Sequence, residues 1–282
     1  MPVADAKPVG RSGYIDRDGL RLHHLEYGDA GAVVVIVPGI TSPAATWEFV
    51  SLDLARDYRV ITLDIRGRGL SDTPPAGYSL EDYAGDVNAV IKQLGVQRPA
   101  LVGHSMGARI AAAVRVLHHG VAGPVVLADP PLTGPGRGTY PMSLEAFMDQ
   151  LQAARSGAAP EDLLRYFPTL TPEHLTLRAR WLPTCDENAV RESWLNFHRE
   201  DFFPYLRELE PPVLFMYGGD SPVVPESALP EIKETRPDVE IARIPGAAHM
   251  IPWDNTEDFL AETRRFLERV FASRPADSPR LG

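Results

Sequence analysis

The sequence has 282 residues, of which 44% are hydrophobic and 23% are charged, as suits a globular protein that buries a substantial core. The net charge of −10 at pH 7 argues against nucleic acid or an anionic membrane as a partner. The single cysteine, Cys185, excludes an intramolecular disulfide. No apolar run reaches the roughly 18 residues of a membrane span, and the initial "MPVADAKPVGRSG" lacks the apolar stretch of a signal peptide. We therefore expect a soluble cytoplasmic protein.

Strand patterns begin near the start of the chain and recur almost to its end. Residues 13–28 alternate in character around Asp18-Gly19, which is a strong signal for a β-hairpin. Short apolar runs rich in β-branched residues follow, at 32–39, 58–64, 99–104, 123–129, 211–218 and 239–246. Because these runs are almost continuously apolar, they predict strands buried on both faces, as in a parallel sheet between two helix layers.

Helix patterns lie between those runs. Residues 79–95 place their apolar side chains on one helical face, and Ser79 can cap the start with Asp82 three residues further on. Residues 106–120 and 255–271 have the same character. The alternation of strands and helices predicts an α/β protein with a mostly parallel central sheet flanked by helices.

The alternation stops between residues 132 and 205. This stretch has no clear strand pattern, contains several prolines and has helical pieces rich in Trp, Arg and Phe. It is too long for a simple loop, so we interpret it as a helical cap inserted into an α/β core. The expected parts are a core of residues 1–131 and 206–272, a cap of residues 132–205, and a disordered tail of residues 273–282.

The segment "GHSMG" (103–107) has the pattern G-x-S-x-G of a nucleophile elbow. The pattern alone is weak evidence, because composition produces it by chance in about one chain in ten of this length. Its context is stronger, since a buried strand leads directly into it and an alanine-rich helix leads directly out. Ser105 is therefore the expected nucleophile, and an ordinary strand–helix turn that contains a serine is the alternative.

Two backbone amides are expected to stabilise an oxyanion beside Ser105. The helix that starts after Ser105 directs the positive end of its dipole at this position, so the amide of Met106 is one expected donor. The other is expected in the loop "PGITS" (38–42), where Ile40 is our choice. The usual version of this loop begins His-Gly, whereas a proline precedes the glycine here.

His249 is the expected general base. It lies in "IPGAAHMIPWDN" (244–255), between the last predicted strand and the last predicted helix. Such a loop is at the carboxyl edge of the sheet, where ligands bind in open α/β sheets. The other seven histidines fall in the hairpin, in the elbow, at a helix C-terminus or in the cap, where they have ordinary explanations.

The third member of such a triad is a carboxylate that holds the imidazole tautomer and stabilises the imidazolium. Two strand ends offer one. Asp129 ends the run 123–129 before two prolines, and a buried aspartate there needs a partner, which His249 would supply. Asp220 follows the run 211–218, where it is also suited to a turn or to the cap of the next segment.

From about residue 13 to residue 271 the chain resembles the α/β-hydrolase superfamily. Three features carry this resemblance: "DIRGRGLSD" (64–72), the elbow at Ser105 and the loop at His249. The order Ser, acid, His along the chain is also that of the superfamily. A halide-releasing member is disfavoured, because its nucleophile would be an aspartate at position 105.

In many members of this superfamily the loop after the later strand reads G-x-x-D-x-V-V-P, and its Asp is the acid. Gly218 and "VVP" (223–225) align with that pattern and place Ser221 at the acid position, with Asp220 one residue early. The resemblance therefore favours Asp129 as the acid and leaves Asp220 as the alternative.

A closer resemblance is to the N-formylmaleamate deformylases, α/β-hydrolases of aerobic nicotinic acid breakdown. The segments that carry it are 37–47, 63–71, 101–109, 128–141, 177–185 and 247–254. This resemblance implies hydrolysis of the N-formyl amide bond of N-formylmaleamate to maleamate and formate, through a formyl-enzyme on Ser105 and without a metal or cofactor. It also implies that the earlier aspartate, Asp129, is the acid.

The implied substrate is a small anion, whose carboxylate needs a cation or several convergent hydrogen-bond donors. The candidates are Arg137, Arg178, Arg180 and His198 in the cap, and Thr41 and Ser42 beside the oxyanion loop. A solvated or structural ion pair is the alternative role for any one of these arginines. Other activities that share the triad are hydrolysis of a carbon–carbon bond in a ring-cleavage product and hydrolysis of small carboxylesters, and a hydrolase-fold ligand receptor is the non-catalytic alternative.

Overall fold

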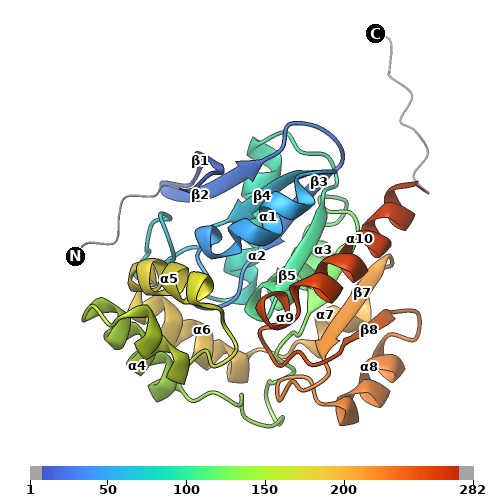
Figure 1. Cartoon of the computed structure of the whole chain (residues 1–282). Helices are drawn as coiled ribbons and strands as arrows, with labels where there is room; N and C mark the ends of the chain where they lie inside the picture. The colour runs from blue at the N-terminus through green and yellow to red at the C-terminus, as the bar shows by residue number, and fades with distance from the viewer. Residues whose placement is uncertain (1–7, 273–282) are drawn as a thin grey trace.

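The computed structural model describes residues 8–272, and a twisted sheet lies at its centre (Figure 1). The strands lie across this sheet in the order β1-β2-β4-β3-β5-β6-β7-β8. They are β1 (Arg11–Arg17), β2 (Leu20–Tyr27), β3 (Val33–Val37), β4 (Arg59–Leu63), β5 (Ala100–His104), β6 (Val125–Ala128), β7 (Val213–Gly218) and β8 (Glu240–Ile244). Each apolar run predicted from the sequence contains one of these strands.

Strand pairing follows the prediction of a mostly parallel sheet. β1 and β2 form the antiparallel hairpin, and Asp18 and Gly19 at its turn both have positive φ (56° and 85°). β2 pairs antiparallel with β4, and every later neighbour pairs parallel. Because helices cover both faces of such a sheet, the side chains from Val34 to Val37 are completely buried.

Helices cover the sheet from both sides. They are α1 (Glu48–Leu54), α2 (Leu80–Gln93), α3 (Met106–Leu117), α4 (Leu144–Arg155), α5 (Pro172–Trp181), α6 (Glu187–Arg199), α7 (Phe203–Glu208), α8 (Leu229–Thr235), α9 (Ile251–Asp254) and α10 (Thr256–Ala272). Short 3-10 helices are η1 (Ala44–Trp47), η2 (Pro160–Arg165), η3 (Leu182–Thr184) and η4 (Glu226–Ala228). Figure 1 shows α1 and α10 in front of the sheet, while α2 and α3 pack together behind it. No helix within residues 8–272 is both long enough and apolar enough to cross a membrane.

We use the name cap segment for residues 132–205, which lie between β6 and β7. It holds α4, η2, α5, η3 and α6 and the start of α7. Figure 1 shows α4, α5 and α6 gathered beside one end of the sheet. α7 instead packs against α3, so the chain has already returned to the core at this helix. The predicted tail, residues 273–282, lies outside the described residues.

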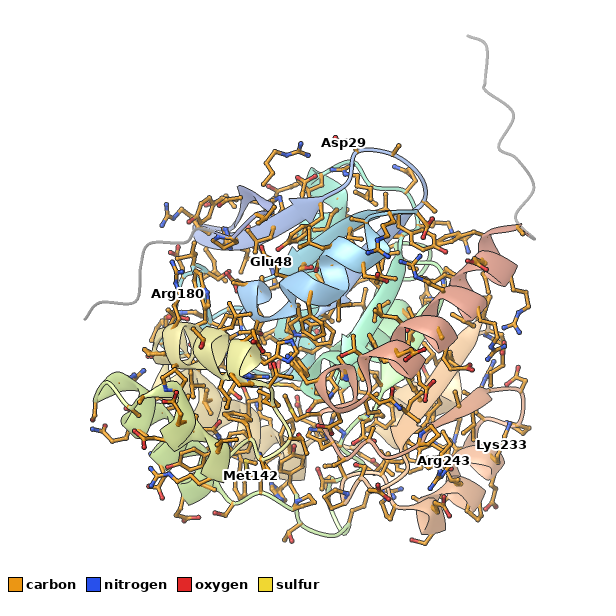
Figure 2. The ribbon with its side chains drawn as sticks, viewed as in Figure 1. Asp29, Glu48, Met142, Arg180, Lys233 and Arg243 are labelled. Carbon is orange, nitrogen blue, oxygen red and sulfur yellow. The ribbon has the colours of Figure 1, made fainter. Side chains whose placement is uncertain are left out.

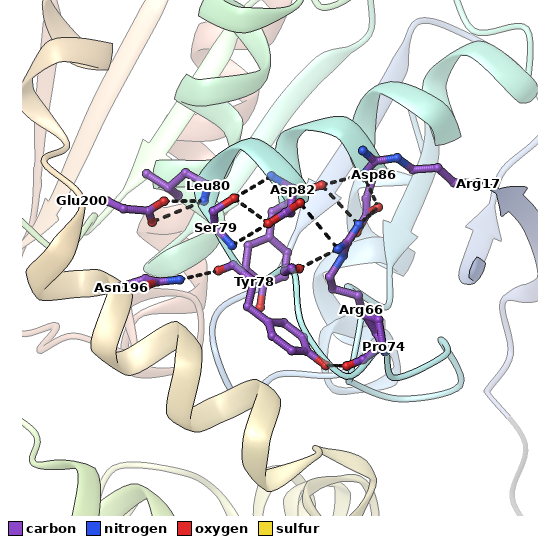
Figure 3. Close-up of polar contacts among 12 residues, drawn as sticks. Arg17, Arg66, Pro74, Tyr78, Ser79, Leu80, Asp82, Asp86, Asn196 and Glu200 are labelled. Atoms are coloured by element: carbon purple, nitrogen blue, oxygen red, sulfur yellow. Dashed lines mark hydrogen bonds and ion pairs between the residues drawn. The ribbon is translucent and has the colours of Figure 1, made fainter. Parts of the chain in front are cut away.

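The start of α2 joins the cap segment to the core (Figure 3). Ser79 Oγ accepts a hydrogen bond from the amide of Asp82 at 3.1 Å, and the Asp82 carboxylate accepts one from the amide of Ser79 at 3.0 Å. This is the predicted capping box. A carboxylate oxygen of Glu200, just after α6, accepts a hydrogen bond from the amide of Leu80 at 3.0 Å. Free amides of the first turn of α2 are therefore satisfied partly by its own residues and partly by the cap segment.

Candidate active site

The predicted elbow lies where β5 ends and α3 begins. Its central residue, Ser105, has φ 55° and ψ −123°, which is strained for a residue with a side chain. A Cβ on Gly103 would lie 2.3 Å from the carbonyl oxygen of Gly107, and a Cβ on Gly107 would lie 1.9 Å from that of Val37. Glycine is therefore required at both positions, because the backbone approaches itself so closely.

Ser105, His249 and Asp129 form a hydrogen-bonded line at the carboxyl edge of the sheet, which we call the Ser105 line. Ser105 Oγ lies 3.0 Å from His249 Nε2, and His249 Nδ1 lies 2.7 Å from Asp129 Oδ2. Because an ionised carboxylate can only accept, His249 carries its proton on Nδ1 and presents the lone pair of Nε2 to the serine hydroxyl. This geometry suits a general base that activates a serine nucleophile.

Asp129 and not Asp220 lies against His249. Asp129 is completely buried, at φ 50°, directly after β6. Its carboxylate accepts further hydrogen bonds from Ser221 Oγ at 2.5 Å and from the amide of Gly218 at 3.2 Å, so no charge is left unsatisfied. Asp220 is exposed to solvent. Ser221, which occupies the usual position of the acid in the later loop, thus donates to the aspartate from the earlier strand.

The loop after β3 lies against the nucleophile. A Cβ on Gly39 would lie 3.3 Å from the Cβ of Ser105. Within residues 8–272, neither the amide of Ile40 nor that of Met106 donates a hydrogen bond to another protein group. Two unpaired amides beside Ser105, one of them at the N-terminus of α3, are suited to stabilise an oxyanion. The buried Arg68 holds this loop through a 3.0 Å hydrogen bond from its Nε to the carbonyl of Ile40.

A small cleft opens at Ser105, between the core and the cap segment. Thr41 and Ser42 line it from the core, and Phe167 and Arg178 line it from the cap segment. The walls are mainly apolar, and Arg178 is the arginine among the described residues that line them. Such a cleft suits a small molecule that carries one negative group.

Arg178 is buried, with only 1% of the residue exposed. Its Nη1 donates to the carbonyl of Thr41 at 2.7 Å, and its guanidinium carbon lies 4.9 Å from the ring centres of both Phe167 and Trp253. Its Nε and Nη2 have no hydrogen-bond partner in residues 8–272. Burial lowers the pKa of Arg178 to about 10, so the group remains charged at neutral pH. A buried cation with free N–H groups is suited to receive an anion.

Arg180, a predicted substrate contact, lies on a different side of the same helix. It lines a separate surface hollow together with Trp181 and Ser12. Figure 2 shows it near the β1–β2 hairpin and well apart from Met142, which lines the cleft. The side chains of residues two positions apart on an α-helix point in directions that differ by about 200° around the helix axis. Of these two predicted candidates on α5, only Arg178 lines the cleft at Ser105.

Tyr140 is a site residue that the sequence analysis missed. Its hydroxyl lies 3.1 Å from His249 Nε2, and it is buried in the cleft wall. The amide of Tyr140 donates to His198 Nε2 at 3.2 Å, and His198 Nδ1 donates to the carbonyl of Trp194 at 3.2 Å. Both ring nitrogens of His198, another predicted substrate contact, are thus used within the cap segment. His198 holds Tyr140 in place and is not among the described residues that line the cleft.

The remaining predicted substrate contacts also differ in whether they line the cleft. Thr41 and Ser42 line the cleft, as expected for residues that contact a substrate. Arg137 instead forms ion pairs with Glu231 at 2.7 Å and with Asp201 at 3.4 Å, which is a structural role. In the described part of the chain, no three His, Cys, Asp or Glu side chains come together as a metal site.

His104, the variable residue of the elbow, supports the loop that carries the base. Its Nε2 donates to the carbonyl of His249 at 2.8 Å. Burial lowers the pKa of His104 well below its usual value, and the positive charges possible at His249 and Arg178 act in the same direction. His104 Nδ1 has no hydrogen-bond partner within residues 8–272, which fits a neutral ring.

The sheet order, the elbow and the Ser105 line together define an α/β-hydrolase. The family model described as alpha/beta hydrolase fold matches residues 32–256, and the chain belongs to this family. N-formylmaleamate deformylase of Pseudomonas putida is 39% identical over 259 residues, which are 91% of this chain and 96% of that protein. A crystal structure of N-formylmaleamic acid deformylase, also from Pseudomonas putida, matches with a TM-score of 0.85 and 34% identity, and the match covers 90% of this chain and 100% of that one.

A second relative is 2-(acetamidomethylene)succinate hydrolase of Mesorhizobium japonicum. It is 28% identical to this chain, over 90% of this chain and 94% of that protein. These comparisons confirm the resemblance to α/β-hydrolases, and in particular to N-formylmaleamate deformylases, that the sequence motifs indicated.

Proposed function

We propose that this chain is a serine hydrolase that cleaves the N-formyl amide bond of N-formylmaleamate and releases maleamate and formate. The proposal is supported by the 39% identity to a named N-formylmaleamate deformylase over almost the whole of both chains. In the molecule itself, the observation that carries it is Arg178, a buried cation with free N–H groups in the cleft of the nucleophile. N-formylmaleamate has a carboxylate at one end, which suits Arg178, and a formyl group at the other, which suits Ser105.

The first half of the reaction forms a formyl-enzyme. His249 Nε2 takes the proton of the Ser105 hydroxyl while the serine oxygen attacks the formyl carbon. The amides of Ile40 and Met106 hold the oxyanion of the tetrahedral intermediate, and Asp129 stabilises the imidazolium. The carbon–nitrogen bond then breaks, its electron pair stays on the nitrogen, and the nitrogen is protonated as maleamate leaves.

The second half clears the formyl group from the enzyme. His249 Nε2 takes a proton from a water molecule, whose oxygen attacks the formyl carbon on Ser105. When this second intermediate collapses, Ser105 regains its proton and formate leaves. The departing nitrogen in the first half carries another acyl group, so it leaves more easily than an ordinary amine would.

The alternative activities are not favoured. Both named relatives reported above are hydrolases of compounds that carry an N-acyl group, whether N-formyl or acetamido. A carbon–carbon bond hydrolase or a simple carboxylesterase shares the Ser105 line and differs in the cleft. A ligand receptor with this fold has no need of two unpaired oxyanion amides beside a serine.

We also propose that the enzyme works in the cytoplasm on a small anion, without a nucleic-acid or membrane partner. Its one cysteine, Cys185, is buried and unpaired, which is consistent with a reducing compartment. The net charge of −10 disfavours polyanionic partners, so the local positive charge of Arg178 is what admits an anionic substrate.

A substrate panel on the purified protein tests the reaction. We expect rapid hydrolysis of N-formylmaleamate, measured as formate release, and much slower turnover of formamide, p-nitrophenyl acetate and a ring-cleavage dienoate. Turnover of the ester with no attack on N-formylmaleamate would remove this substrate and retain the hydrolase class. Tight binding of N-formylmaleamate, seen as a thermal shift without turnover, would support the receptor instead.

Replacement of Arg178 tests the carboxylate site. In Arg178→Met, which keeps an unbranched side chain without the charged guanidinium group, kcat/KM for N-formylmaleamate should fall about 100-fold, as for loss of a buried charged hydrogen bond. The same variant should hydrolyse the uncharged p-nitrophenyl acetate within about 3-fold of wild type. Arg180→Met is the matched control, because it removes the same group two residues away on the outer side of α5. Equal losses in the two variants would contradict a specific role of Arg178.

A further inference from the structure

The hydroxyl of Tyr140 occupies a position that the reaction as written above does not use. It lies 3.1 Å from His249 Nε2, the atom that receives the serine proton, and it is close enough to the Ser105 hydroxyl to interact with it. It comes from the cap segment, whereas the Ser105 line comes from the core. The cap segment therefore places a proton donor at the reacting atoms themselves.

The position of Tyr140 is fixed from several sides. Its ring is stacked on Phe147 at 6.2 Å and tilted against Phe197 at 5.0 Å, and its amide is bonded to His198. Only 5% of the residue is exposed. A buried ring packed in this way keeps its hydroxyl in one place, which a general acid needs if it is to act at a defined atom.

The chemistry leaves a task for such a group. After His249 has taken the serine proton, its Nε2 carries a single N–H, and the oxygens of Ser105 and Tyr140 both lie within hydrogen-bond distance of it, at 3.0 and 3.1 Å. The leaving nitrogen departs from the formyl carbon and must be protonated, because an amide anion is a poor leaving group. Since Tyr140 Oη is within hydrogen-bond distance of Nε2, it can accept from Nε2–H and at the same time donate its own proton to a neighbouring atom.

We propose that Tyr140 is a further catalytic residue, which passes the proton from His249 to the departing nitrogen of the substrate. This proposal rests on the function proposed above. As the carbon–nitrogen bond breaks, its electron pair goes to the nitrogen, and the nitrogen takes the proton of the Tyr140 hydroxyl. Tyr140 Oη takes the proton of His249 Nε2, so both side chains end the step neutral and the proton lost by Ser105 appears on maleamate.

The tyrosine is suited to donate a proton and not to act as a base. Burial raises the pKa of Tyr140 above its ordinary value, and the negative charge of Asp129 adds to this rise, although the nearby Ser105 hydroxyl opposes it. The group is therefore a neutral O–H throughout the neutral pH range and is restored to that state after each proton transfer.

Two substrates that give the same formyl-enzyme separate this role from a structural one. N-formylmaleamate releases an amide nitrogen that needs a proton, whereas p-nitrophenyl formate releases a phenolate that leaves without one. In Tyr140→Phe, kcat/KM for N-formylmaleamate should fall about 100-fold, within the usual range for loss of a general acid. The value for p-nitrophenyl formate should stay within about 3-fold of wild type. Tyr166→Phe, a second tyrosine of the cap segment, is the matched control and should leave both values unchanged.

The other outcomes each overturn the proposal. Equal losses on the two substrates would mean that Tyr140 only positions His249 or Ser105. No loss on either would mean that its hydroxyl serves packing alone. If wild-type enzyme does not hydrolyse N-formylmaleamate, the proposed function fails instead. The role of Tyr140 is then decided by comparing Tyr140→Phe with wild type on any amide that is hydrolysed and on the p-nitrophenyl ester of the same acyl group.

Discussion

Besides the Ser105 line, the molecule contains a second hydrogen-bonded line of the same three residue types. Ser12 Oγ lies 2.8 Å from His23 Nε2, and His23 Nδ1 lies 2.7 Å from Asp64 Oδ2. These distances are nearly those of the Ser105 line, 3.0 and 2.7 Å. In both lines the carboxylate fixes the tautomer, so that Nε2 faces a serine hydroxyl. We propose that only the Ser105 line is catalytic, and the surroundings of the two serines give the reason.

The backbone differs most at the two serines. Ser12 lies within strand β1, opposite Leu25, and is exposed to solvent. Ser105 is almost completely buried in a strained turn, between a loop and the first turn of α3. That turn brings the unpaired amides of Ile40 and Met106 to the nucleophile, as an oxyanion requires.

The carboxylates differ as well. Asp64 accepts hydrogen bonds from the amides of Ala44 at 2.6 Å and Leu70 at 3.0 Å in addition to the one from His23. It therefore joins the hairpin, the start of η1 and the loop after β4, which is a structural role. The comparison shows that hydrogen-bond distances alone do not identify a catalytic triad, because a structural network can reproduce them.

The largest effect is expected from exchanging the two serines for alanine in turn. Ser105→Ala should lower kcat for N-formylmaleamate about 10⁶-fold, because the nucleophile is lost and only binding and oxyanion stabilisation remain. Ser12→Ala should leave kcat within about 2-fold and lower the free energy of unfolding by about 1 kcal/mol, since the buried ring of His23 loses a partner. Formate release and urea unfolding measure the two quantities. A large loss of kcat in Ser12→Ala would show that the second line also takes part in catalysis.

The next largest effect on kcat is expected from replacing the acid of the Ser105 line. Asp129→Asn should lower kcat about 10⁴-fold, because an amide stabilises the wrong tautomer of His249 and does not stabilise the imidazolium. Asp220→Ala should stay within about 2-fold, since Asp220 is exposed and does not contact His249 in the structure. The measurement is kcat at saturating substrate, with circular dichroism to check that each variant is folded. The reverse order of the two losses would make Asp220 the acid.

Local sequence signals were enough for the sheet and for the members of the Ser105 line. Apolar runs of strand length predicted β3 to β8, and the alternating pattern around Asp18-Gly19 predicted the hairpin of β1 and β2. Of the two glycines of the elbow, Gly103 is crowded by the nearby backbone of Gly107, whereas Gly107 is crowded by the backbone of Val37 from another strand. The same logic offered Asp129 as one of two candidate acids, because it directly follows a buried strand, and the family resemblance favoured it over Asp220. Alignment with the family pattern placed Ser221 at the usual position of the acid. Its hydrogen bond to Asp129 connects the ends of two strands that are far apart in the sequence, so no local pattern predicts it.

The cap segment was less predictable, for a physical reason. Whether Arg178 or Arg180 faces the cleft depends on how α5 is rotated against the core. The buried residues of α5, Leu175 and Arg178, are three positions apart and so lie on one face of the helix. The apolar pattern of this face is too weak for the sequence to show which side is buried. Tyr140 lies outside any helix or strand and reaches His249 only after the cap segment has folded, so no sequence periodicity marks it.

The two lines also differ in that a second buried histidine, His104, supports the histidine of the Ser105 line. His104 donates to the carbonyl of His249, and its pKa is lowered well below the usual value by burial. In the unfolded chain its pKa returns to about 6.5. Below that pH the unfolded state binds a proton that the folded state does not, so the free energy of unfolding falls as the pH is lowered. The loss continues until the pH reaches the lower pKa of the folded state.

His104→Gln measures this contribution, because glutamine keeps an N–H donor at the end of its side chain and does not titrate. Between pH 7 and pH 5 the wild-type protein should lose more of its unfolding free energy than the variant, at up to about 1.4 kcal/mol per pH unit below 6.5. Urea unfolding at the two pH values gives both numbers, and the other histidines cancel in the difference. The same pH dependence in both proteins would mean that folded His104 takes up the proton. The loop that carries His249 would then have to accommodate a positive charge on His104 beside Arg178. The Ser105 line would also lack the neutral histidine behind its base, which distinguishes it from the line of Ser12, His23 and Asp64.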